Sequence, residues 1–253
     1  MLTECARCVK HSPAMSVISA AESQTADPNE KRERILDAAL DQFAAYGFSR
    51  TSMADIAKAA KMSRPALYLH FGNKEEIFRA TLETILSRAY ARAQVALCDP
   101  PSPAASSKSS DRARAQLERE IAEQLTEFLQ LYHGDLMELF TETMHGDDLL
   151  ATDHSRSSDI LEDAAKRSRA GLTRYFNDLT SRGAFDPERS GQPAARWVEL
   201  ILLSPRGLKQ DQPSVPQYRR RLDALAISVA AGMSGRASER KSNPKQRRKK
   251  STS

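Results

Sequence analysis

The sequence predicts an all-α fold in which three small N-terminal helices are joined by a long fourth helix to a larger helical body, with about nine helices in total. Apolar residues recur at helical spacing in almost every segment between loops, and no segment alternates apolar and polar residues as a half-buried strand does. The composition is 40% hydrophobic and 28% charged with only 10 glycines, which is typical of a soluble, largely helical chain.

The first helix is expected from about residue 30 to Gly47. One of its faces is apolar, because the residues on it recur three and four positions apart. These residues are Ile35, Leu36, Ala39, Leu40 and Phe43. Gly47 ends the helix, since glycine adopts the left-handed conformation of a helix C-terminus at little cost.

A second, short helix is expected to open at Ser52. The Ser52 hydroxyl can accept hydrogen bonds from the first turn, and Asp55 completes an S-x-x-D capping box. A tight turn at residues 61–62 follows, and Ser63 then caps a third helix. Pro65 lies in the first turn of that helix, where a missing N–H does no harm.

The third helix combines a buried side with a polar, basic start. Leu67 and Phe71 lie four residues apart and are expected to anchor it to the core. Arg64 stands at its beginning, and Tyr68 and His70 follow near its end. Two short helices joined by a tight turn, the second with such a start, are typical of a helix-turn-helix that inserts a recognition helix into the major groove of DNA.

The rest of the chain is predicted to be a series of longer helices. The fourth is expected from about 74 to 98, and a Pro- and Ser-rich loop at 99–110 separates it from the others. The body helices are expected at about 111–133, 134–150, 156–182, 190–204 and 215–233. The predicted division of the whole chain is a disordered leader at 1–29, a helix-turn-helix domain at 30–75, a helical regulatory domain at 76–235 and a disordered basic tail at 236–253.

The positive charge of the chain is concentrated in its C-terminal tail. Residues 236–253 hold eight Lys or Arg and one Glu, a net charge of +7, whereas the whole chain carries +5, so the remainder is −2. Such a run either adds sequence-independent affinity for phosphates or only keeps the chain soluble, and the pattern leaves both open.

Two groups of potential metal ligands are weak signals. Cys5 and Cys8 form a C-x-x-C in the leader, but neither two further ligands nor a βαβ context accompanies them. The stretch from His145 to Asp148, with His154 beyond it, has the composition of a polar loop between helices. We therefore expect no bound metal and no cofactor.

The N-terminal region from Arg32 to Phe78 resembles the DNA-binding domain of the TetR family of transcriptional regulators. The resemblance rests on residue types at fixed spacing along the three helices and the start of the fourth. The matching residues are Ile35, Ala38, Ala39, Phe43, Tyr46, Gly47, Phe48, Thr51, Ser52, Ile56, Ala57, Ser63, Leu67, Tyr68, His70, Phe71, Asn73 and Lys74. One departure is Lys61, which occupies a turn position where the family often has glycine, and which is expected to adopt a positive φ.

The resemblance implies a DNA-contacting surface built from the N-termini of the second and third helices. Thr51 and Ser52 would offer hydroxyls and backbone N–H groups to a phosphate. Arg64 would donate two hydrogen bonds to a guanine, and Ala66 would contact a thymine methyl. The full set of expected DNA-binding residues is Arg50, Thr51, Ser52, Ser63, Arg64, Pro65, Ala66, Tyr68, His70 and Lys74.

A homodimer is expected, because one such domain reads few base pairs and two copies about 34 Å apart read a palindrome. The last two predicted helices would form the interface. Its apolar centre would be Trp197, Leu200, Ile201, Leu225 and Ile227, unless these side chains only close the core of the monomer.

The resemblance also implies an unidentified small-molecule effector that binds in the helical body and favours one spacing of the two DNA-binding domains. Candidate pocket residues are aromatic, histidine and methionine side chains of the body, although most would be expected in any core. They are Tyr132, His133, Met137, Phe140, His145, Tyr175 and Phe176.

The sequence carries no enzyme motif, neither a nucleophile elbow nor a phosphate loop nor a zinc-protease helix, and we expect no enzyme. The favoured interpretation is a dimeric repressor released from a palindromic operator by its effector. The alternatives are a sequence-tolerant DNA or nucleoid binder that uses the basic tail, and a ligand-independent regulator or activator. We expect a cytoplasmic protein without a membrane segment, because no run approaches the roughly 18 apolar residues that a span requires and no secretory signal is visible.

Overall fold

The structure, a computed structural model, describes residues 28–103, 111–141 and 154–234. The Cys5–Cys8 pair, the His145–Asp148 stretch and the basic tail lie outside these residues, and so does the leader up to residue 27. The leader was expected to end at residue 29, but the first helix already begins at Pro28. Proline suits the first turn of a helix, which explains the earlier start.

Three helices form a compact N-terminal unit, here called the head. They are α1 (Pro28–Tyr46), α2 (Met53–Ala59) and α3 (Arg64–Tyr68). Aromatic rings close the head against the next helix, because Phe78 packs edge-on against Phe43 and Phe48 with ring centroids 5.6 and 5.1 Å apart. Gly47 has a φ of 79°, so the expected glycine stop of the first helix is confirmed.

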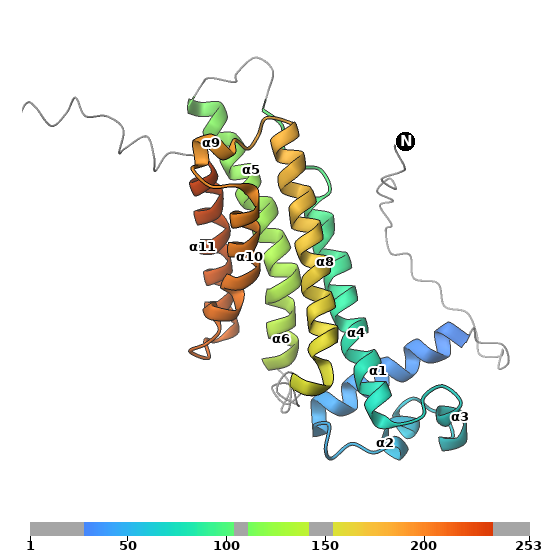
Figure 1. The fold of residues 1–253 in the computed structure, drawn as a ribbon. Coiled ribbons are helices and arrows are strands. Elements are labelled where there is room, and N and C mark those ends of the chain that lie inside the picture. The colour runs from blue at the N-terminus through green and yellow to red at the C-terminus, as the bar shows by residue number, and fades with distance from the viewer. Residues whose placement is uncertain (1–27, 104–110, 142–153, 235–253) are drawn as a thin grey trace, which may run out of the picture.

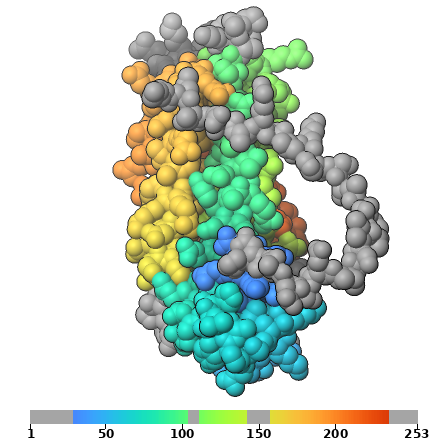
Figure 2. All heavy atoms as spheres, turned by 90° about the vertical axis from the view of Figure 1, so that its right-hand side faces the viewer, coloured from blue at the N-terminus to red at the C-terminus, as the bar shows by residue number. Residues whose placement is uncertain are grey.

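The remaining helices form the body, and α4 connects it to the head. In chain order they are α4 (Lys74–Ala93) with its 3₁₀ extension η1 (Gln94–Leu97), α5 (Asp111–Leu129), α6 (Asp135–Thr141), α8 (His154–Ser181), α9 (Pro187–Ser190), α10 (Ala194–Leu208) and α11 (Val215–Met233). Figure 1 shows the long helices running alongside one another above the head. In Figure 2, α4 and α8 lie side by side over it. Every regular element in the described ranges is helical, which confirms the predicted fold class.

Two predicted helix boundaries in the body were wrong. The expected break near residue 134 is instead a π-helical turn, η2 (Gln130–Gly134), which makes α5 and α6 one continuous helical path. The helix expected from about residue 190 starts at Ala194, after Pro193, and continues through Pro205 to Leu208. Pro205 is tolerated because it lies in the last turn of α10, where little helix follows it.

The described chain has three apolar clusters. The largest fills the body between α5, α8, α10 and α11, the second fills the head, and a small third one, around Leu86 and Ile160, lies between α4 and α8. Within the described residues, no helix is both long and apolar enough to cross a bilayer.

The expected dimer centre divides into buried and exposed side chains. Ile201 is only 1% exposed and belongs to the core of the monomer, so its assignment to an interface centre was wrong. Trp197 and Leu225 are partly buried against the same core. Leu200 and Ile227, in contrast, are 44% and 57% exposed.

Candidate nucleic-acid interface

The N-terminus of α2 carries the capping box that the sequence predicted. The Ser52 amide and hydroxyl both donate to Oδ2 of Asp55, over 2.9 and 2.6 Å, and the Asp55 amide donates to the Ser52 hydroxyl. These hydrogen bonds, from the hydroxyl and then the amide of Ser52, lower the pKa of Asp55. Ser52 is exposed, and Arg50 just before it is exposed as well.

Thr51 faces the interior of the head, which differs from the expected presentation of its hydroxyl to a phosphate. The residue is 3% exposed, and its Oγ1 lies 2.8 Å from the carbonyl oxygen of Gly47 and 3.2 Å from that of Gln42. Its hydroxyl proton therefore satisfies carbonyl groups at the C-terminus of α1. The side chain closes the connection between α1 and α2 and does not stand on the outer surface.

Lys74, at the start of α4, is also engaged within the head. Its Nζ donates to the carbonyl oxygens of Phe48 and Thr51 over 2.8 and 2.9 Å. The same ammonium lies 4.3 Å from the centroid of the Phe48 ring, within the range of a cation–π contact. Lys74 thus ties the α1–α2 connection to α4, a structural role that the sequence analysis did not assign to it.

The turn between α2 and α3 is tight, and Lys61 adopts a φ of 55° within it. Two backbone hydrogen bonds close the turn, from the Lys61 amide to Lys58 and from the Met62 amide to Ala57. The expected positive φ at Lys61 is confirmed. The left-handed conformation is rare for residues other than glycine, so this turn is held by the packing of α2 and α3.

Helix α3 presents its polar start to the surface. The Ser63 hydroxyl accepts from the Ala66 amide over 3.3 Å, so the predicted cap is present. Arg64 and Pro65 are exposed, and Ala66 is half-buried. Arg64 is therefore an exposed positive charge on the first residue of the helix.

The C-terminal end of α3 exposes three further side chains. Tyr68 is 47% exposed and His70 is half-buried. Leu69, which the sequence analysis did not select, is 86% exposed. The exposure of Leu69 could have been predicted from the sequence. Leu67 and Phe71 mark the buried face, and a residue midway between them points to the opposite side of a helix.

The comparisons with known proteins concern first of all this head. Residues 35–81 match the family described as bacterial regulatory proteins, tetR family. The chain is 42% identical over 62 residues to the HTH-type transcriptional regulator SrpR of Pseudomonas putida, covering 24% of this chain and 29% of that protein. It is 40% identical over 58 residues to the probable acrEF/envCD operon repressor of Escherichia coli strain K12, covering 23% of this chain and 26% of that protein.

These matches span less than a third of the length of either relative. Two solved structures nevertheless resemble the whole described fold. A putative TetR-family transcriptional regulator from Syntrophomonas wolfei superposes with a TM-score of 0.53 at 16% identity, covering 82% of this chain and 96% of that one. The fatty acid degradation regulator FadR from Bacillus halodurans gives 0.51 at 16% identity, covering 81% and 97%. At this identity the likeness concerns the fold alone.

The head is thus a helix-turn-helix of the kind found in DNA-binding regulators. Over residues 35–81 it matches the N-terminal domain of the tetR family of bacterial regulatory proteins.

Residues of α5, α9 and α11 line a cavity of about 300 Å³ in the body. Helix α9 and the start of α5 lie at the end of the body opposite the head (Figure 1). The walls of the cavity include the apolar side chains of Leu117, Ile121 and Met233. None of the six described residues predicted to line a pocket borders this cavity. Tyr132, Phe140, Tyr175 and Phe176 are instead buried in apolar clusters, His133 and Met137 are partly buried, and His145 lies outside the described residues.

Proposed function

We propose that the protein is a homodimeric transcriptional repressor that binds a palindromic operator through two heads and leaves it when a small molecule binds to the body. The observation that carries the proposal is the capped, exposed start of α3, with Arg64 accessible on a head whose other conspicuous polar groups, Thr51 and Lys74, are used to hold the fold. An arginine at this place can read guanine through two parallel hydrogen bonds.

The small number of exposed polar side chains on the head supports recognition of the DNA sequence by few residues. Arg64, Pro65, Tyr68 and Leu69 are exposed on α3, and Ser52 and Arg50 flank the N-terminus of α2. We assign base contacts to Arg64 and Ala66, and phosphate or sugar contacts to Arg50, the backbone amides at Ser52, Tyr68 and His70. Phosphate contacts of this kind set the position of the protein on DNA, whereas base contacts select the sequence.

Exposed apolar side chains on α10 and α11 support the dimer. Leu200, Leu203 and Ile227 are 44%, 60% and 57% exposed, and the two helices pack side by side. Leu200 and Leu203 lie three residues apart on α10 and so share one face of that helix, which can pair with the same face of a second copy. Replacing Leu203 and Ile227 with glutamate is expected to give a monomer in sedimentation experiments.

The matched control for the dimer is Val95→Glu, since Val95 is 62% exposed but lies on η1. This variant should sediment as the native protein does. A native chain that sediments only as a monomer at micromolar concentration would exclude the dimer.

The operator is tested by selecting genomic DNA fragments with the full chain and aligning those that are retained. A palindrome with half-sites about one helical turn apart supports the proposal. Arg64→Ala should then lower the preference for the operator over a scrambled duplex by about 5- to 150-fold, the value of one bidentate arginine–guanine contact. Arg50→Ala should weaken binding to both duplexes alike and reduce the salt slope.

The second candidate function is sequence-tolerant DNA binding, which the net charge of +7 on residues 236–253 favours. A chain truncated after residue 235 separates the two. If the truncated chain keeps the ratio of its affinities for the operator and for a scrambled duplex, the head recognises the DNA sequence. If the full chain shows no such ratio and truncation abolishes binding, the sequence-tolerant function is the right one.

A further inference from the structure

The short helix α6 lies where the apolar clusters of the molecule meet. Leu136 packs against all three clusters, and Phe140, which is 4% exposed, is part of the cluster that fills the head. One turn of helix therefore touches the interior of the head and the interior of the body at once. Any group that fixes α6 relative to the body also restrains the head.

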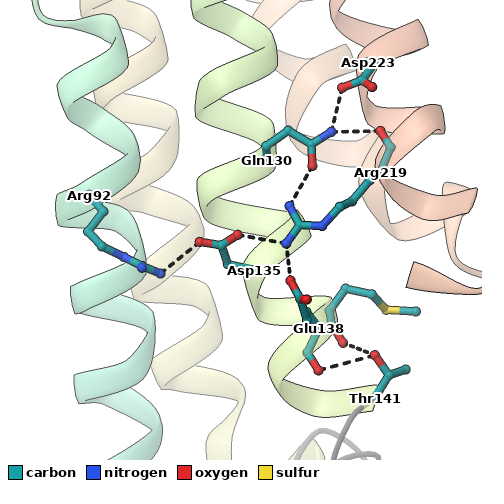
Figure 3. Close-up of polar contacts among 8 residues, drawn as sticks. Arg92, Gln130, Asp135, Glu138, Thr141, Arg219 and Asp223 are labelled. Atoms are coloured by element: carbon teal, nitrogen blue, oxygen red, sulfur yellow. Dashed lines mark hydrogen bonds and ion pairs between the residues drawn. The ribbon is translucent and has the colours of Figure 1, made fainter. Parts of the chain in front are cut away.

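A single arginine makes that connection from the C-terminal helix. Arg219, on α11, donates from Nη2 to Oδ1 of Asp135 over 3.0 Å, and the same nitrogen bonds to Oε2 of Glu138 (Figure 3). Asp135 also pairs through Oδ2 with Arg92 of α4, 3.2 Å away. Arg219 thus reaches both acidic residues of α6, and through Asp135 it is joined to the helix that leads to the head.

The π-helical turn before α6 shapes the site for this arginine. Gln130, at its start, accepts from Nη1 of Arg219 over 2.9 Å and donates to the Arg219 carbonyl and to Asp223. Gly134, at its end, leaves room for the guanidinium, because a Cβ there would lie 2.6 Å from Nη1 of Arg219. A π-helical turn inserts a residue into a helix and rotates the next turn about the axis, and for this reason such turns redirect side chains at functional sites.

The side chains of this cluster are partly buried. The side chains of Arg219 and Asp135 are each 28% exposed, and that of Glu138 is 44% exposed. Removing the guanidinium would leave two carboxylates on α6, of which Asp135 would still pair with Arg92 within the described residues. The resulting repulsion acts directly on α6.

We propose that Arg219 is a positioning residue that fixes α6 against α11 and thereby sets the orientation of the DNA-binding head relative to the body. This inference rests on the proposed function only where it concerns the spacing of the half-sites in DNA. Because α11 is also a helix of the proposed dimer interface, Arg219 determines how far apart two heads stand, and so which spacing of half-sites the dimer accepts.

The orientation of the head is measurable without DNA. Spin labels are placed at Lys58 on α2 and at Glu123 on α5, both exposed, in a full-length chain whose three native cysteines are replaced by serine. The sample is diluted with unlabelled chain so that only distances within one chain are recorded. Arg219→Gln is expected to broaden the distance distribution between the two labels.

Arg221→Gln is the matched control, since Arg221 lies on the same helix but pairs with Asp211 in the preceding loop. It should leave the distribution as narrow as in the native chain. Gly134→Ala is a second test, because its methyl displaces the Arg219 guanidinium while alanine is a better helix former than glycine. A broadened distribution in Gly134→Ala therefore cannot be attributed to a weakened helix.

The inference is overturned if folded Arg219→Gln keeps the native width, or, should that variant not fold, if Gly134→Ala keeps it. Operators lengthened by one or two base pairs give the functional readout. Native protein should discriminate against them, and Arg219→Gln should lose about 2- to 30-fold of that discrimination, the range for residues that carry coupling between sites. Failure of the native protein to bind any palindrome would count against the proposed function alone, since the distance measurement is independent of DNA.

Discussion

The Nζ of Lys74 lies 2.8 Å from the carbonyl oxygen of Phe48 and 4.3 Å from the centre of the ring of the same residue. One ammonium thus caps a loop carbonyl and covers an aromatic face that is itself packed in the core of the head. With its second hydrogen bond, to the carbonyl of Thr51, it joins the α1–α2 connection to the start of α4.

Lys74→Met should therefore destabilise the head as well as weaken DNA binding. Two carbonyl groups lose a charged donor, and hydrogen bonds to charged groups contribute about 1.5–3 kcal/mol each. We expect the free energy of unfolding to fall by about 3 kcal/mol, the lower end for two such bonds, measured by urea denaturation without DNA. Lys58→Met, on the exposed side of α2, is the control and should change it little. If Lys74→Met leaves the stability unchanged, the contacts of Lys74 within the head do not stabilise it, and DNA binding would be its remaining role.

In the absence of DNA, Thr51→Val should lower the stability of the protein more than Ser52→Ala does. Valine keeps the shape of Thr51 but removes the hydroxyl that donates to the carbonyls of Gly47 and Gln42, two hydrogen bonds that contribute about 0.5–1.5 kcal/mol each. Ser52→Ala removes an exposed helix cap, worth about 1 kcal/mol. Thermal unfolding of both variants gives the comparison, and a milder effect of Thr51→Val would contradict the inward role of that hydroxyl.

Lys61→Gly should stabilise the protein. The φ of 55° costs a lysine about 1–2 kcal/mol, and glycine avoids most of this although it loses more freedom on folding. A net gain of about 0.5–1 kcal/mol should raise the melting temperature. Lys58→Gly, three residues earlier inside α2, is expected to lower it, since glycine in a helix costs about 1 kcal/mol relative to alanine. A lower melting temperature in both variants would mean that the contacts of the Lys61 side chain stabilise the protein by more than its backbone strain costs.

The stability of the body should depend on pH through His133. Burial, and to a smaller extent the charge of Lys209, lowers the pKa of His133 from 6.5 to about 4. The folded state therefore binds fewer protons than the unfolded state between these values, so stability is complete above pH 6.5 and is lost as the pH falls towards 4. The loss is at most about 3 kcal/mol, from the size of the shift.

His133→Gln should remove this part of the pH dependence. The measurement is the difference in unfolding free energy between native protein and variant at about pH 7 and about pH 4.5, since other groups titrate equally in both. The native protein should lose more stability than the variant on acidification. Equal losses would show that His133 is protonated as easily in the folded chain as in the unfolded one.

Much of the head could be predicted from local patterns. The caps at Ser52 and Ser63, the glycine stop at Gly47 and the buried pair of Leu67 and Phe71 are each encoded within a few residues. Such features depend on hydrogen bonds and steric limits along a single stretch of chain, and residue type and spacing are enough to indicate them.

The inward use of Thr51 and Lys74, the π-helical turn before α6 and the division of the expected dimer residues into core and surface could not be predicted in this way. Each depends on which distant segment supplies a partner: Lys74 reaches back to Phe48, and Gln130 and Glu138 meet Arg219 from the far end of the chain. The amino-acid sequence by itself determined most of the helices, many of their ends and the family of the head, because these arise from short-range periodicity and capping. Only the tertiary structure decided which polar side chains of the head are exposed and which are engaged within the fold, because the partners of a donor depend on its neighbours in space.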